Sequence, residues 1–69
     1  MIMYVKPGCP YCDQARAGLA AKGVEWEERD ATANPAWKRE LMDHSRGSGM
    51  VPTMVAPDGG ITVGWEGKG

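Results

Sequence analysis

The chain opens with a short apolar run that is typical of a buried strand. Apolar residues follow one another without interruption from Ile2 to Val5, and a run without alternation suits a parallel strand that is covered on both faces. The Pro-Gly pair at residues 7–8 then breaks the pattern. The sequence therefore predicts a first strand over residues 1–6.

A helical spacing replaces the strand pattern after this break. Pro10 suits the first position of a helix, where a backbone N–H would lack a partner in any case. Ala15 and Leu19 then lie on the same helix face as Cys12. Gly23 is a common helix terminator. We therefore predict a helix that begins at Pro10 and ends just before this glycine.

A second strand and a second helix follow from the same two periods. Residues 24–30 alternate between apolar and charged side chains, which indicates a half-buried strand. Asn34 can cap a helix whose first residue is Pro35. Trp37 and the leucine one turn later are expected to face the core, and His44 is expected to be a cation at the C-terminal end of this helix.

The last third of the chain predicts a β-hairpin. Residues 50–56 form an apolar run that Pro52 interrupts, residues 57–60 have the turn sequence Pro-Asp-Gly-Gly, and residues 61–65 form a final strand. Residues 66–69 are too few and too rich in glycine for another helix. The predicted order is therefore β-α-β-α-β-β, an α/β domain.

Size and composition limit what this chain can be. Its 69 residues allow one domain over residues 1–69, and 42% apolar with 25% charged side chains is typical of a globular protein. With no phenylalanine, its five methionines and three tryptophans must supply much of the core. A net charge of −1 offers no basic surface for nucleic acid and no polybasic patch for a membrane. No apolar segment suggests a membrane span or a secretory signal, so we expect a cytoplasmic monomer.

Two cysteines, Cys9 and Cys12, carry the candidate chemistry. A disulfide between them would close a very small loop and remove little entropy from the unfolded chain, so it is no structural staple. The pair could instead serve in redox chemistry, or it could supply two of the four ligands of a zinc site. Structural zinc needs four ligands, and His44 is the only other soft ligand in the chain. We therefore expect redox chemistry and no metal.

The predicted helix start gives the two thiols different roles. Cys9 falls at the helix N-terminus, where unpaired N–H groups and the helix dipole favour a thiolate. Lys6 is expected to add a cation beside it. Cys12 lies almost one turn further on and is expected to be more buried and less ionised. This pattern favours Cys9 as the attacking nucleophile and Cys12 as the resolving thiol.

Two segments together resemble a known family. The sequence Lys-Pro-Gly-Cys-Pro-Tyr-Cys at residues 6–12, with Met-Val-Pro at residues 50–52, is similar to the active-site segments of the dithiol glutaredoxins. The resemblance extends over residues 1–66. It implies a thioredoxin-like fold with a mixed four-stranded sheet and helices on its faces. It also implies a thiol–disulfide oxidoreductase that reduces protein disulfides, glutathione mixed disulfides, or both.

The resemblance also implies roles for single residues. Cys9 would attack the disulfide of a protein or of a glutathione conjugate. The bond before Pro52 would be cis, and the Val51 backbone would pair with a bound peptide. Lys6 and Tyr11 match family positions that contact glutathione. No resident cofactor is implied, because glutathione serves as reductant or co-substrate.

The chain departs from the family pattern at three places. Met50 stands where a threonine is usual. Gly64 and Trp65 stand where the family has two glycines before an acid that holds the γ-glutamyl group of glutathione. We expect this pair at the glutathione site, with Trp65 either lining the active-site groove or packing against the fold. The last helix of the family is missing or truncated.

Two related functions stay open beside the leading one. Redoxins that take electrons from thioredoxin reductase and supply ribonucleotide reductase resemble glutaredoxins and carry an aromatic residue near the position of Trp65, although they usually lack the Pro-Tyr pair. Some glutaredoxins instead hold an iron–sulfur cluster between two monomers, using the first cysteine and glutathione. The proline between the cysteines disfavours that role.

Overall fold

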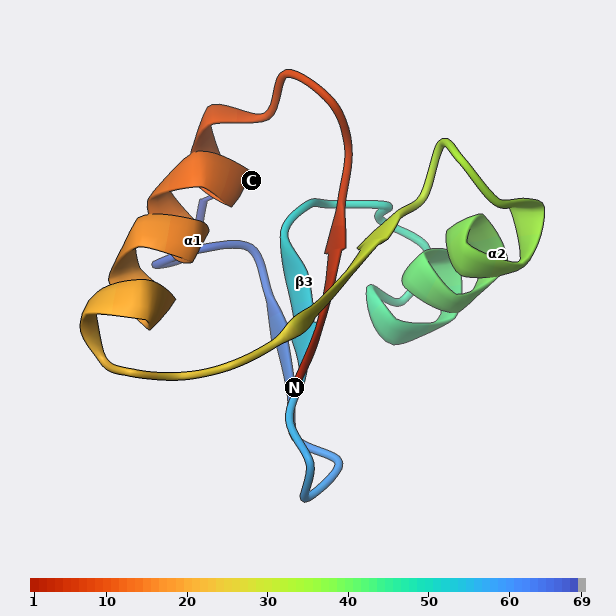
Figure 1. Cartoon of the computed structure of the whole chain (residues 1–69). Helices are drawn as coiled ribbons and strands as arrows, with labels where there is room; N and C mark the ends of the chain where they lie inside the picture. Colours follow the sequence, from red (N-terminus) through yellow and green to blue (C-terminus); the bar gives the residue numbers. More distant parts are fainter. Residues whose placement is uncertain (69) are drawn as a thin grey trace.

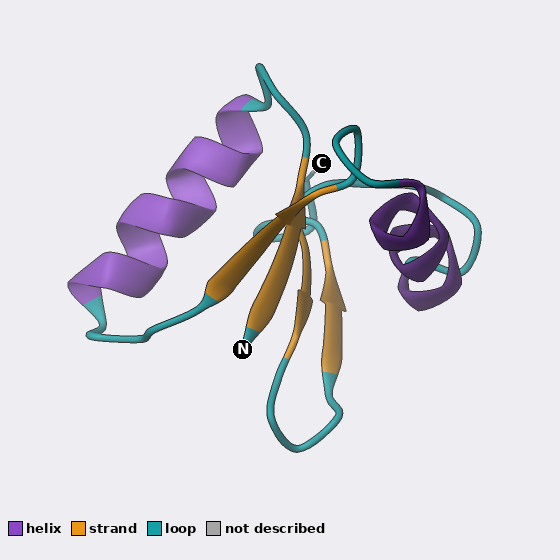
Figure 2. Cartoon of the chain, turned by 45° about the vertical axis from the view of Figure 1, so that its right-hand side comes forward, coloured by secondary structure: helices purple, strands orange, loops and turns teal. Residues whose placement is uncertain are grey.

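The computed structural model describes residues 1–68 and contains four strands and two helices in the predicted order (Figure 1). These elements are β1 (Ile2–Val5), α1 (Pro10–Ala21), β2 (Glu27–Asp30), α2 (Pro35–His44), β3 (Thr53–Val55) and β4 (Ile61–Val63). The strands form one sheet in the order β2-β1-β3-β4, in which β1 and β2 are parallel and the other two pairs antiparallel. The two helices cover opposite faces of this sheet (Figure 2). The thioredoxin-like fold expected from the sequence is confirmed.

Both helices begin where the sequence predicts. Cys9 is the N-cap of α1, and Asn34 caps α2 by accepting the Ala36 N–H at 2.9 Å. A proline at the first helical position follows each cap. At the other end of α1 the backbone of Gly23 turns into the left-handed region, with a φ of 71°. This conformation is the usual way for a helix to end at glycine.

The second strand is shorter than predicted. It begins at Glu27 rather than at residue 24, because Glu27 pairs with Ile2, the first residue of β1. The residues before it have no strand beside them. Val24 and Trp26 are partly buried and pack against the core as expected.

The predicted third strand loses its first residues to local hydrogen bonds. It begins at Thr53, not at residue 50. The Met50 N–H donates to Ser48 Oγ at 3.2 Å, and the Met50 carbonyl accepts from the Thr53 hydroxyl at 2.6 Å. These side-chain partners replace strand pairing.

The final strand ends at Val63 rather than at Trp65. Gly64 has a φ of 83°, which turns the chain. Trp65 and Lys68 then exchange backbone hydrogen bonds of 2.6 and 2.9 Å across a two-residue turn. Both turn residues have positive φ values, which is the geometry of a tight hairpin turn.

The core lies on both sides of β1. Met3 and Tyr4 are successive residues of that strand, and both are buried. Successive strand side chains point to opposite faces, so each reaches a different layer. The Tyr4 hydroxyl donates to Glu40 Oε1 of α2 at 2.7 Å, and Arg29 of β2 donates to the same oxygen at 2.6 Å. This shared carboxylate joins α2 to two strands.

The second helix places one of its two predicted core residues at the edge of the core. Leu41 is fully buried, as expected. Trp37 is only half-buried, and its ring lies 6.0 Å from the Arg29 guanidinium. The core expectation for Trp37 is therefore wrong, because the helix turns this residue toward a charged side chain of β2.

Candidate active site

Cys9 lies at the N-terminus of α1, between the helix and the loop before β3. Its Sγ accepts the Cys12 backbone N–H at 3.3 Å, and it donates to the Val51 carbonyl at 3.6 Å. The side chain is half-buried, so reactants can reach it. The N–H groups of a first helical turn lack partners within the helix, and the Cys9 sulfur accepts one of them.

Cys12 lies one turn further along α1 and is fully buried. Burial raises the pKa of the Cys12 thiol to about 12, and its hydrogen bond with Cys9 acts in the same direction. Cys12 therefore stays protonated at neutral pH. An accessible sulfur beside a buried one is the contrast that nucleophilic and resolving thiols require.

Val51 and Pro52 form the wall that faces Cys9. Both are buried, and the bond between them is cis, as the resemblance implies. The Pro52 carbonyl accepts the Gly64 N–H at 2.7 Å, which ties the segment after β4 to this wall. A Cβ at Gly64 would lie 2.7 Å from the Lys68 carbonyl oxygen. The close approach and the positive φ together require glycine there.

Lys6 lies at the end of β1 and reaches toward the same wall. Its Nζ donates to the Gly49 carbonyl at 3.4 Å, two residues before Val51. Tyr11, in the first turn of α1, is half-buried. The structure thus brings Cys9, Cys12, Val51 and Pro52 close together. Lys6 is connected to this group by its hydrogen bond to Gly49.

A pocket of about 580 Å³ opens beside Lys6. Its lining residues are Lys6, Ala31, Thr32, Pro35 and Lys38. Both charged members are cations. Sequence analysis missed Lys38, because its only signal is its place in the first turns of α2. Which face of the helix it occupies depends on how α2 packs.

The indole ring of Trp65 lies against α1 at Gly18. A Cβ at Gly18 would lie 2.5 Å from its indole ring, so the absence of a side chain at position 18 permits the contact. At ~1.5 Å of rise per residue, Gly18 lies ~13 Å along the helix from Cys9. Figure 1 shows the segment after β4 beside α1. Of the two roles expected for Trp65, packing is the one that its position supports.

Residues 1–68 hold no group of three His, Cys, Asp or Glu side chains that could bind a metal ion. His44 lies at the end of α2, with its ring 5.6 Å from that of Tyr4. Neither helix in this part of the chain is long and apolar enough to cross a membrane.

Comparisons with known proteins agree with this geometry. A family model described as Glutaredoxin matches residues 1–59. Proteins named Glutaredoxin 3 from Escherichia coli strains K12, O6:H1 and O157:H7 are each 44% identical to the chain over 50 residues. The match covers 72% of this chain and 59% of each relative, so it spans about three fifths of the relatives' length.

Proposed function

The chain belongs to the glutaredoxin family of thiol–disulfide oxidoreductases, and on that premise we propose that Cys9 and Cys12 reduce protein disulfides and glutathione mixed disulfides. One observation carries the proposal. The accessible Cys9 sulfur accepts the first-turn N–H of Cys12, while Cys12 itself is buried and protonated. We further propose that the protein acts as a monomer in the cytoplasm, where thiols are kept reduced.

The reaction proceeds by two thiol exchanges. The Cys9 thiolate attacks one sulfur of the substrate disulfide, so a Cys9–substrate disulfide forms and the other substrate sulfur leaves as a thiolate. Cys12 then gives its proton to the second departing substrate sulfur and attacks Cys9. The substrate gains two electrons, and the protein is left with a Cys9–Cys12 disulfide. Two glutathione molecules restore the dithiol and leave as oxidised glutathione.

The pocket beside Lys6 supports glutathione as the reductant. Glutathione carries free carboxylates, and Lys6 and Lys38 place two cations in one opening. We propose that a carboxylate binds between them while the peptide backbone pairs with Val51. Tyr11 and the backbone of Gly64 are the further proposed contacts. The Trp65 side chain packs on α1 and contributes by holding Gly64 in place.

A redoxin coupled to thioredoxin reductase is the second candidate. Met50 and Trp65 replace the residues that complete a glutathione site in the family, which favours a weaker use of glutathione. Such a protein would pass its electrons to a partner such as ribonucleotide reductase.

Two coupled assays separate the candidates. The purified protein is given hydroxyethyl disulfide with glutathione, glutathione reductase and NADPH, and separately a protein disulfide with thioredoxin reductase and NADPH. We expect glutathione-dependent NADPH consumption that Cys9→Ser abolishes. Cys12→Ser should retain activity on glutathione mixed disulfides and should accumulate mixed disulfides with protein substrates. Rapid turnover with thioredoxin reductase and none with glutathione would instead establish the redoxin.

A further inference from the structure

Two exposed methionines lie near the loop that carries Val51. Within residues 1–68 the large apolar side chains that remain exposed are Met42 at 36%, Met50 at 36% and Ile61 at 47%. Met50 directly precedes Val51, whose carbonyl faces Cys9. Ile61 lies at the start of β4. Met50 therefore differs from Ile61 in adjoining the wall of the active site.

Each methionine sulfur lies against a glycine that adjoins this wall. Met50 Sδ lies 3.3 Å from the place that a Cβ on Gly64 would take, and Gly64 is hydrogen-bonded to Pro52. Met42 Sδ lies 3.0 Å from the place of a Cβ on Gly49. We call Met42 and Met50 the methionine rim.

The backbone holds the rim in place. The N–H and carbonyl of Met50 both have side-chain partners, so this exposed residue does not belong to a loose loop. Met42 lies on α2 one turn after Lys38, and residues four apart share a helix face. The Lys6 Nζ lies 4.0 Å from the same Cβ position on Gly49 that Met42 Sδ approaches, so the rim lies beside the cation of Lys6.

We propose that the methionine rim selects protein disulfides in which an apolar side chain adjoins the reactive cysteine and an acidic group lies nearby. The acidic group would meet Lys6 and Lys38, whose pocket has no acidic residue in its lining. Methionine side chains adapt to apolar partners of different shapes. Glutathione has no apolar side chain, so it can use the cationic part of this surface but not the rim.

This inference rests on the proposed function and names its substrate class. The test uses symmetrical disulfide dimers of two short peptides, each with one cysteine and a nearby glutamate. The peptides are identical except that the residue before the cysteine is leucine in one and serine in the other. We expect the wild-type protein to reduce the leucine dimer with a kcat/KM about tenfold higher, the scale of one well-placed apolar contact.

Variants that keep side-chain length but add polarity locate this preference. Met42→Gln combined with Met50→Gln should lower the preference to about twofold or less. Cys9 of the same variant should react with iodoacetamide as fast as Cys9 of the wild type, which shows that the fold and the dithiol are intact. Ile61→Gln is the matched control, since it changes an exposed apolar residue away from the rim and should leave the preference unchanged.

Four results would overturn the proposal. Suppose that the protein reduces hydroxyethyl disulfide but reduces both dimers equally well. The rim would then have no role in substrate selection, and the proposed function would stand. A preference for the leucine dimer that persists in the doubly substituted protein would also show that the rim does not select substrates. A mass in solution that rises with concentration, and that the two substitutions lower, would assign the rim to contact between copies. Failure to reduce any disulfide would overturn the proposed function and this inference with it.

Discussion

Cys9 and Cys12 are separated by only two residues, and the start of α1 gives them opposite surroundings. Pro10 fixes the first helical residue, so Cys9 becomes the cap and Cys12 turns inward with Ala15. The sequence suffices to predict this contrast, because helix start and helix period are local properties. It does not suffice for Lys38, whose approach to Lys6 depends on the packing of α2.

The two lysines of the pocket give a residue-scale prediction. Lys6→Ala or Lys38→Ala should each raise the KM for glutathione in the hydroxyethyl disulfide assay by about fivefold, since one partly exposed charged contact is worth about 1 kcal/mol. Lys22→Ala, at the far end of α1, is the control and should leave the KM unchanged. An unaltered KM in both pocket variants would exclude the pocket as the carboxylate site.

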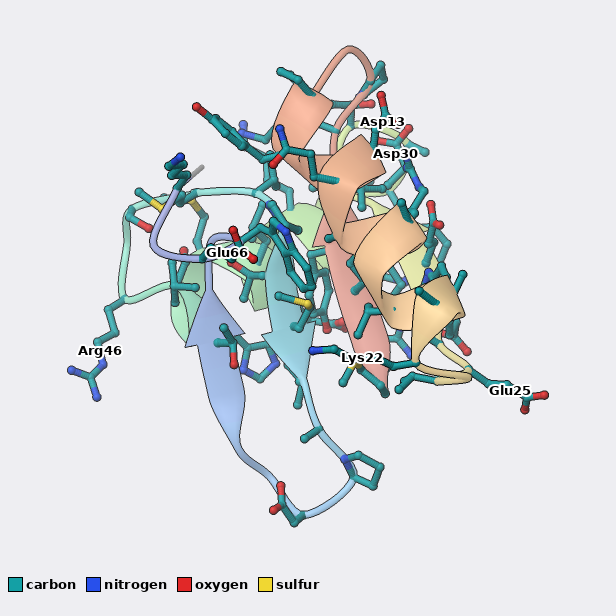
Figure 3. All side chains as sticks on the ribbon, turned by 90° about the vertical axis from the view of Figure 1, so that its left-hand side faces the viewer. Asp13, Lys22, Glu25, Asp30, Arg46 and Glu66 are labelled. Carbon is teal, nitrogen blue, oxygen red and sulfur yellow. The ribbon has the colours of Figure 1, made fainter. Side chains whose placement is uncertain are left out.

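The two helices end with the same backbone motif but different residues. In α1 the left-handed position is Gly23, which the sequence signals. In α2 it is Arg46, with a φ of 58°, and the next N–H, that of Gly47, donates to the Met42 carbonyl at 2.7 Å. No local signal shows that an arginine will take this conformation. Figure 3 shows the Arg46 side chain projecting away from the rest of the molecule.

This strained helix end gives an element-scale prediction. Arg46→Gly should raise the free energy of unfolding by about 0.5–1 kcal/mol, because glycine lacks the Cβ that makes the left-handed region costly. Arg39→Gly removes the same side chain from the interior of α2 and should lower the free energy of unfolding by about 1 kcal/mol. Urea unfolding of the three proteins measures both values. Destabilisation by Arg46→Gly would show that the arginine side chain matters more than the backbone.

At the scale of the whole molecule, the order of elements was predictable and the contacts between distant segments were not. The hydrophobic periods predict all six elements, but strand ends depend on partners, as the pairing of Glu27 with Ile2 shows. The same limit applies to Trp65, which reaches Gly18 only after the sheet has formed. The site itself was predictable because the Pro-Tyr pair between the cysteines and the Val-Pro pair at residues 51–52 resemble the active-site segments of the glutaredoxin family.

Burial of Cys12 predicts how the stability of the reduced protein depends on pH. Its pKa is about 12 in the folded state against an ordinary value of 9.0, so the unfolded chain loses this proton first. The contribution of the protonated Cys12 thiol to the free energy of unfolding is therefore fully present below pH 9 and is lost as pH rises toward 12. Urea unfolding in excess phosphine should show a steeper loss of stability over this range than Cys12→Ala does. Parallel pH profiles would contradict the burial of an uncharged thiol.

The division of roles between an accessible Cys9 and a buried Cys12 is tested most directly by measuring which cysteine reacts first. The fully reduced protein is treated with limiting iodoacetamide at neutral pH, and fragment-ion mass spectrometry locates the modified sulfur. The same reaction in concentrated urea is the control, in which both cysteines should react at similar rates. We expect the folded protein to be modified at Cys9 while Cys12 stays unmodified. Modification of Cys12 first, or of both at equal rates in the folded protein, would contradict this division of roles.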